Sequence, residues 1–194
     1  MVIKLKWKPI IIVLILITLV ILGWVGIQYS QRHFLKLVYK TDYSDIVTTY
    51  AKQYDLDPYL IYAVIKTESD FKKDAVSNVG ARGLMQVMND TYQWVNTKLK
   101  DKETSYDDMF EPDKNIKYGA FLLDYLVDEF KDYEAAIAAY HAGRGAVNNW
   151  LKDSKYSSNG KTLDKIPISD TDHYVHKVMK SYYKYKSIYE NKGE

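Results

Sequence analysis

The feature that most restricts what this chain can fold into is an unbroken apolar stretch near its N-terminus. Residues 10–27 carry no charge, and Thr18 is their one polar side chain. A predominantly apolar run of about 18–20 residues is long enough to cross the hydrocarbon core of a bilayer as a helix. Trp24 and Tyr29 lie near its end, where aromatic rings favour the membrane–water interface. We therefore expect a transmembrane anchor over residues 10–29.

The charges beside this stretch predict its orientation. Residues 1–9 form a basic tail with three lysines and no acidic residue, so the positive-inside rule places the tail in the cytoplasm and the rest of the chain outside. A signal peptide has similar flanks, but residues 23–29 lack the pair of small residues at which such peptides are cleaved. We favour an uncleaved single-pass anchor in the cell membrane, followed by a connector over residues 30–42. Secretion after signal cleavage is the alternative.

The composition of the remaining chain argues against several classes of function. The first 40 residues carry six basic and no acidic side chains, which leaves 21 basic against 25 acidic residues, a net charge of −4. A slightly acidic domain is a poor candidate for binding nucleic acid. The chain has no cysteine, which excludes disulfides and cysteine-based sites. His173 and His176 stand at helical spacing without a convincing third ligand, so we expect no metal and no cofactor.

The spacing of apolar residues over 43–190 predicts one compact, mainly α-helical domain. Apolar residues recur there at helical spacing, and no segment alternates with the period of a strand. Asp90 is a candidate N-cap, and the polar segment 100–108 is expected to be exposed. We expect helices over residues 45–54, 58–70, 90–99, 112–130, 134–142, 146–152 and 171–189.

The second of these helices has an acidic residue on its apolar face. Glu68 follows Ile61, Val64 and Ile65 by seven, four and three positions, which places all four side chains on one side of the helix. Partial removal from water disfavours the charged form of a carboxyl group and raises its pKa, as a general acid near neutral pH requires. Taken alone, a buried Glu68 paired with a cation explains the position equally well.

Four segments around this acid form an ordered set. They are Glu68–Ser69, Ser77 with residues 80–86 (GARGLMQ), residues 138–147 (AAYHAGRGAV), and residues 166–171 (IPISDT) with the following 174–178 (YVHKV). In this order and spacing they closely resemble the lytic transglycosylase domain of the soluble lytic murein transglycosylase type, which is related to goose-type lysozyme. The resemblance covers roughly residues 45–190 and implies a lysozyme-like, mainly α-helical domain.

The resemblance implies a role for individual residues. Glu68 matches the catalytic acid and base, and Ser77 matches a serine beside it, near the N-acetyl group of the sugar. Tyr140 matches a tyrosine whose hydroxyl contacts the catalytic carboxylate. Asp170 falls where the family usually has a Glu that helps to shape the site. The residues assigned to substrate binding are Gln86, Met85, Ser69, Gly83, His141 and Tyr174.

The family cleaves the β-1,4 bond between N-acetylmuramic acid and N-acetylglucosamine and leaves a 1,6-anhydro end, so the implied substrate is the glycan strand of peptidoglycan. Ordinary glycosidases need a second carboxylate at ~5–5.5 Å or ~6.5–9.5 Å from the first. A helix turns Asp70 away from Glu68, which leaves Asp74 as the local candidate. A mechanism with one carboxylate avoids this need: Glu68 protonates the leaving oxygen, the N-acetyl group of the substrate stabilises the positive charge, and Glu68 then takes a proton from the C6 hydroxyl.

The chain departs from the family pattern at three positions. His141 stands where Asn is usual, Asp170 is one methylene shorter than Glu, and Asn89 replaces a common Pro. Three alternatives stay open: a muramidase that hydrolyses the same bond with water, a non-catalytic peptidoglycan-binding or assembly protein, and a membrane scaffold with an ion-paired Glu68. A cell-envelope secretion or conjugation assembly is a candidate partner.

Overall fold

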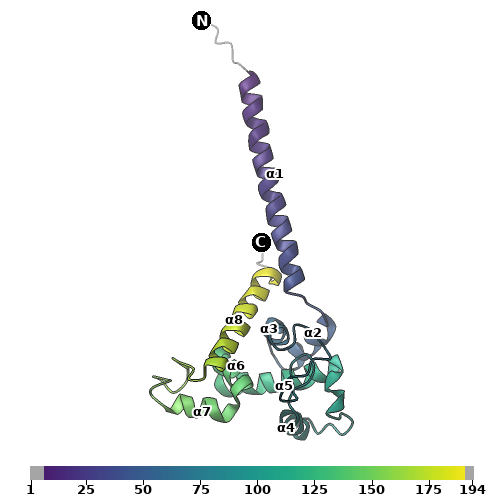
Figure 1. The fold of residues 1–194 in the computed structure, drawn as a ribbon, viewed down its shortest axis with the longest axis vertical. Helices are drawn as coiled ribbons and strands as arrows, with labels where there is room; N and C mark the ends of the chain where they lie inside the picture. Colours follow the sequence, from purple (N-terminus) through teal and green to yellow (C-terminus); the bar gives the residue numbers. More distant parts are fainter. Residues whose placement is uncertain (1–6, 191–194) are drawn as a thin grey trace. The chain divides into compact units, whose positions relative to one another are not determined.

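The computed structural model describes residues 7–190, and the chain divides into two units, Met1–Lys40 and Thr41–Glu194. The first unit contains helix α1, Trp7–Val38 (Figure 1). The structure therefore extends the helix through most of the predicted connector, because residues 30–38 continue it without a break. The first six residues of the predicted cytoplasmic tail lie outside the described residues.

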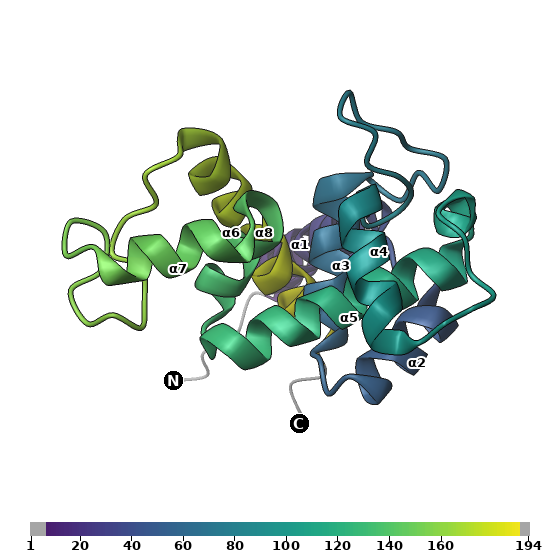
Figure 2. The same cartoon turned by 90° about the horizontal axis from the view of Figure 1, so that it is seen from below.

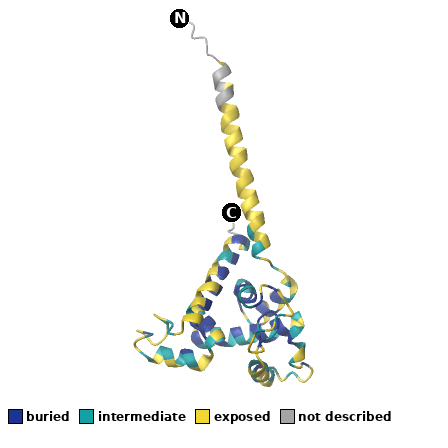
Figure 3. Cartoon of the chain, in the orientation of Figure 1, coloured by how far each residue is buried: buried dark blue, intermediate teal, exposed yellow. Residues whose placement is uncertain are grey.

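Helix α1 presents apolar side chains that the rest of its unit leaves uncovered. The side chains of residues 14–34 are all exposed (Figure 3), and the segment Leu14–Val38 is long and apolar enough to cross a membrane. A soluble protein rarely exposes so large a continuous apolar surface to water. The length and composition of α1 agree with the predicted anchor.

The second unit is mainly α-helical, as predicted. Figures 1 and 2 show α7 toward one end of this unit and α2 and α4 toward the other, with α5 running between them. Its helices are α2 (Ser44–Gln53), α3 (Pro58–Glu68), α4 (Asn89–Leu99), α5 (Pro112–Phe130), α6 (Tyr133–Ala142), α7 (Arg144–Lys152) and α8 (Ser169–Tyr189), with a short 3-10 helix η1 (Asp107–Phe110) before α5.

Helix α3 lies in the centre of this unit and packs chiefly along α8. The Asp57 carboxylate caps it by accepting the backbone N–H of Tyr59 at 2.9 Å, and Pro58 occupies its first turn. Its residues 60–65 are all buried, because α3 is covered on several sides. The helix ends at Glu68 because the chain then reverses: Asp70 and the residue after it take positive φ angles of 48° and 66°.

One prediction for the segment around α4 is wrong, and a second is confirmed only in part. Helix α4 begins at Asn89 with Met88 as its cap residue, so Asp90 lies in the first turn and is not the N-cap. Its charge is still favourable there, since the N-terminal end of a helix carries a partial positive charge. The segment 100–108 is not simply exposed, because Thr104 within it is 5% exposed.

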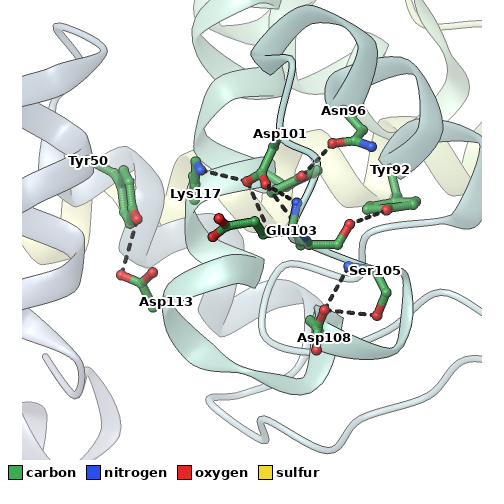
Figure 4. A network of polar contacts seen from close by, with 11 residues as sticks. Tyr50, Tyr92, Asn96, Asp101, Glu103, Ser105, Asp108, Asp113 and Lys117 are labelled. Carbon is green, nitrogen blue, oxygen red and sulfur yellow. Dashed lines mark hydrogen bonds and ion pairs between the residues drawn. The ribbon is translucent and has the colours of Figure 1, made fainter.

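A polar network holds this segment in place (Figure 4). The Asp101 carboxylate accepts hydrogen bonds from the Lys117 ammonium and the Thr104 hydroxyl, both at 2.9 Å, and the Tyr92 hydroxyl donates to the Thr104 carbonyl at 2.5 Å. The Lys117 hydrogen bond holds the pKa of Asp101 well below its usual range. The network joins the end of α4 to α5, and these two helices form one wall of the site described below.

Candidate active site

Glu68 is the last residue of α3, and its side chain lines a cavity of about 260 Å³. The walls come from the loop after α3, from α4 and α5, and from the end of α6. The cavity is lined by Glu68, Ser77, Val79, Ala81, Gln86, Val87, Met88, Thr91, Leu122, Tyr140 and His141. Five of the predicted site residues are therefore brought together here.

The environment of Glu68 favours its protonated form. Burial raises the pKa of Glu68 to about 7, because a charged carboxylate loses its hydration there. A hydrogen bond from Tyr174 and the positive charge of Lys177 act in the opposite direction, since both stabilise the charged form. A carboxyl group with a pKa near 7 can give up a proton and take one back at neutral pH.

The phenol that contacts Glu68 belongs to Tyr174, which corrects the prediction for Tyr140. The Tyr174 hydroxyl donates to Oε1 of Glu68 at 2.7 Å. The Tyr140 hydroxyl instead donates to the backbone carbonyl of Met85 at 2.9 Å, and a phenol has only one proton to donate. Tyr140 thus lines the cavity and fixes the loop beneath it, while Tyr174 orients the carboxylate.

His141 packs against the ring of the same phenol. Its ring stacks on Tyr174 with centroids 4.5 Å apart, and its Nδ1 lies 3.1 Å from Oγ1 of Thr171. Burial lowers the pKa of His141, and the negative charge of Asp170 opposes this. The imidazole is therefore mainly neutral near pH 7, where it packs against the phenol as an aromatic ring.

Ser77 and Gln86 face the cavity from a loop that is folded on itself. Oγ of Ser77 accepts the backbone N–H of Ala81 at 3.0 Å, which leaves its hydroxyl proton for a ligand. The amide nitrogen of Gln86 donates to the carbonyls of Ala75 and Gly83 at 3.1 and 2.9 Å. Both amide protons of Gln86 serve the loop, so its carbonyl oxygen is the group left to meet a sugar.

Three residues assigned to substrate binding lie in the packing beneath the cavity instead, which corrects those predictions. The single hydroxyl proton of Ser69 is shared between two carbonyls, with the shorter contact of 2.8 Å to Leu84 and one of 3.1 Å to Ile65, so it ties the end of α3 to the loop. The side chain of Met85 is fully buried. Gly83 has a φ of +74°, and a Cβ there would lie 2.1 Å from the carbonyl oxygen of Met109.

Asn115 of α5 explains why this loop is held so closely. Its amide nitrogen donates to the carbonyls of Arg82 and Met109 at 2.9 and 2.7 Å, and its amide oxygen accepts the N–H of Met85 at 2.7 Å. Asn115 is fully buried, and these three bonds occupy all but one of its hydrogen-bonding positions. A side chain at Gly83 would displace this amide, so the glycine serves loop packing.

The remaining acidic candidates lie elsewhere. Asp170 is exposed in the first turn of α8 and is not among the residues that line the cavity. Asp70 forms an ion pair with Lys66 at 3.0 Å, and Asp74 is exposed with the Lys73 ammonium at 3.8 Å. Of the described residues that line the cavity, Glu68 is the only one with a carboxyl group.

Sequence reasoning missed part of the cavity. Thr91 of α4 and Leu122 of α5 line it, and no local pattern marks them because their position depends on how the two helices pack. Lys177 was also missed, although a signal was available: it follows Tyr174 by three positions, and residues at that spacing lie on one side of a helix.

Comparison with known proteins identifies the family. The sequence model of the transglycosylase SLT domain matches residues 45–162. The transglycosylase of Enterobacteria phage PRD1 is 36% identical over 116 residues, which cover 60% of this chain and 40% of that protein. The membrane-bound lytic murein transglycosylase C of Edwardsiella ictaluri is 30% identical over 187 residues, which cover 84% of this chain and 51% of that protein.

A solved structure shows the same fold. An inactive Glu-to-Gln mutant of the lytic transglycosylase Slt from Pseudomonas aeruginosa superposes with a TM-score of 0.69 at 31% identity, over 79% of this chain and 25% of that chain. The predicted lysozyme-like helical fold is thereby confirmed. The chain spans about half or less of the length of these relatives. It belongs to the transglycosylase SLT domain family.

Proposed function

We propose that this chain is a lytic transglycosylase that cleaves the β-1,4 bond between N-acetylmuramic acid and N-acetylglucosamine in peptidoglycan and leaves a 1,6-anhydro end. The observation that carries the proposal is the setting of Glu68. Burial raises the pKa of this carboxyl group to about 7, a phenol orients it, and it lines a cavity to which the other described residues contribute no carboxylate. The relatives named transglycosylases support the choice of reaction.

The reaction follows from what one carboxyl group can do. Protonated Glu68 donates its proton to the glycosidic oxygen, so that the N-acetylglucosamine side leaves as an alcohol. The carbonyl oxygen of the substrate's own N-acetyl group stabilises the positive charge that develops at C1. Glu68, now a carboxylate held by Tyr174, takes the proton of the C6 hydroxyl, and O6 attacks C1 to close the anhydro ring. Protons balance, and water is not consumed.

Ser77 and Gln86 suit the task of orienting the sugar. The hydroxyl proton of Ser77 is available to the acetamide, and the amide oxygen of Gln86 can accept from a sugar hydroxyl. Holding the acetamide against C1 matters because the reaction depends on an internal group in place of a second protein carboxylate. The inactive form of the solved relative, which carries a single Glu-to-Gln substitution, agrees with dependence on one carboxyl group.

Digestion of purified peptidoglycan by the full-length chain in detergent tests this proposal. We expect products whose mass is lower than that of hydrolysed products by one water, and loss of all products in Glu68→Gln. Asp74→Asn, which changes an exposed carboxylate nearby, is the matched control and should retain activity. Products with reducing ends would show a muramidase. Binding of glycan without products in the parent chain would show a non-catalytic peptidoglycan-binding protein.

We also propose that α1 anchors the chain in the cell membrane with the N-terminus in the cytoplasm and the domain outside. The apolar span Leu14–Val38, its exposed side chains and the N-terminal lysines support this topology. Because the chain has no cysteine, single cysteines report topology cleanly. A membrane-impermeant maleimide should label Ser187→Cys in intact spheroplasts and Val2→Cys only after permeabilisation. The opposite pattern would reverse the orientation, and loss of the N-terminal label from the mature protein would show cleavage.

A further inference from the structure

Two more cavities adjoin the one that holds Glu68. The first, the Arg82 cavity, has about 420 Å³ and shares Val79 and Met88 with the Glu68 cavity. The second, the Trp94 cavity, has about 280 Å³ and shares Thr91, Leu122 and Tyr140 with it. The two outer cavities have no lining residue in common among those described. The Glu68 cavity therefore lies between them.

The Trp94 cavity has the chemistry of a sugar site. Trp94 of α4 and Tyr125 of α5 meet edge to face with ring centroids 4.8 Å apart. The Arg144 guanidinium lies 5.7 Å from the centre of the Tyr125 ring and pairs with Glu129 at 2.6 Å. The C–H face of a pyranose packs on aromatic rings, while its hydroxyl groups need charged or polar partners at the edge. This cavity offers both.

The Arg82 cavity is built differently but suits the same polymer. Arg82 stacks over the Tyr106 ring at 4.2 Å and pairs with Asp107 at 2.6 Å, so its guanidinium is fixed. Val76 and Val79 beside it are 60% and 74% exposed. Met88, which is 44% exposed, lines the same cavity, and exposed apolar side chains that gather in one patch mark a binding surface. The methyl groups of N-acetyl and lactyl substituents are apolar groups that such a surface would cover.

We infer that the three cavities form one open groove that holds a glycan strand on both sides of Glu68, so that the chain cuts strands at internal bonds. This inference rests on the proposed function. An enzyme restricted to strand ends needs a groove that is closed beyond the terminal sugar, since an open groove admits an internal segment equally well. Both outer cavities are lined partly by exposed residues, Val76 and Asp90 on one side and Gly143 and Arg144 on the other.

The sizes agree with a strand that passes through. Pockets for small ligands commonly have volumes of about 300–1,000 Å³. The three cavities, of about 420, 260 and 280 Å³, lie near or below the lower limit of that range, so each suits only a short piece of a polymer. A polymer that fills all three must continue out of the groove at both ends. Affinity should then rise with strand length until both outer cavities are occupied.

The first test is the length distribution of early products. Long glycan strands are digested by the full-length chain in detergent until a few per cent of bonds are cut, and the strands are separated by size. Internal cleavage predicts a sharp fall in mean strand length with few disaccharides. Disaccharides as the main early product, with the remaining strands at their starting length, would overturn the inference while leaving the proposed function intact.

The second test uses binding, so it is independent of turnover. Glu68→Gln is combined with Val76→Asp to change the Arg82 cavity and, separately, with Trp94→Ala to change the Trp94 cavity. Should Trp94→Ala unfold the protein, Arg144→Ala replaces it. Each change should weaken binding of long strands by about tenfold, with little effect on a disaccharide. Tyr183→Ala, an exposed tyrosine of α8 outside the three cavities, is the control and should bind normally. Unchanged binding of long strands after substitution in either outer cavity would show that the strand occupies one side only.

Discussion

Replacing Glu68 by Gln should stabilise the folded protein at alkaline pH while it removes activity. Burial raises the pKa of Glu68 from an ordinary 4.5 to about 7, and each pH unit of such a difference corresponds to 1.36 kcal/mol. The difference of about 2.5 pH units therefore corresponds to about 3 kcal/mol in the free energy of unfolding.

The direction of the effect follows from proton binding. Between pH 4.5 and about 7 the folded protein keeps a proton on Glu68 that the unfolded chain has lost. The contribution of this proton to stability is fully present below pH 4.5 and is lost as the pH rises through 7. Glutamine does not titrate, so Glu68→Gln avoids the loss. The stability of the parent relative to this variant should fall by about 3 kcal/mol between pH 4 and pH 8.

The assay is urea unfolding of the detergent-solubilised chain at both pH values, followed by near-ultraviolet circular dichroism. Glu103→Gln changes an exposed glutamate in the loop between α4 and η1. It is the matched control and should leave the pH dependence of unfolding as in the parent. A difference between parent and Glu68→Gln that stays constant with pH would show that the carboxylate is fully hydrated, and the argument for a general acid would fail with it.

Four further substitutions test the supports of the site. Tyr174→Phe removes a hydrogen bond that lowers the pKa of Glu68, so the loss of activity with rising pH should move to higher pH and the maximal rate should fall; an unshifted pH–rate profile would contradict this. Gly143→Ala should lower the free energy of unfolding by about 1–3 kcal/mol through its φ of +87° alone, because nothing lies within 4 Å of the added Cβ. Gly83→Ala should lower it by about 1–3 kcal/mol more, because the added Cβ overlaps Met109 and Asn115. Equal melting temperatures of the two variants would refute the packing role of Gly83. Ser69→Ala should lower the free energy of unfolding by about 1–3 kcal/mol, measured by urea unfolding, because it leaves a buried carbonyl of the loop unpaired.

Local signals in the sequence predicted the position of Glu68 well. The cap and proline at the start of α3 and the apolar spacing before Glu68 depend only on neighbours within the same helix, so they could be read without tertiary structure. The same holds for α5 and α6, whose observed ends match the predicted ones within one residue. Pro112 in the first turn of α5 and the Asp132 carboxylate, which accepts the backbone N–H of Ala135 at the start of α6, are local signals of the same kind.

The identity of the phenol could not be predicted in this way. Tyr140 and Tyr174 both lie in the segments that the sequence analysis singled out, and the contact of Tyr174 with Glu68 joins residues 106 positions apart. Which of the two reaches the carboxylate depends on how α6 and α8 pack against α3. The Tyr140 hydroxyl donates to the carbonyl of Met85, so the Tyr174 hydroxyl is the one that donates to Glu68. Only the packed structure shows this arrangement.

Composition also misled for the segment after α4. A run of polar residues usually indicates exposure, but Asp101 has a partner in Lys117, sixteen residues later on the next helix. Pairing lets a charged side chain enter a partly buried position at little cost. A run of polar residues therefore predicts exposure only where the fold brings no partner of opposite charge close to it. Which charged residues pair depends on how the helices pack, and local sequence patterns do not show this.

The arrangement around Glu68 balances opposing influences on one proton. Burial favours the neutral acid, and the C-terminal end of α3, where the helix carries a partial negative charge, acts in the same direction. One hydrogen bond from Tyr174 and the charge of Lys177 restrain the rise. Without that restraint the carboxyl group would hold its proton too tightly to protonate a leaving oxygen, and without burial it would be ionised before the substrate arrived. Because the same group must give a proton and then take one, a pKa of about 7 serves both steps: burial raises the pKa of Glu68, and Tyr174 and Lys177 of α8 keep it from rising further.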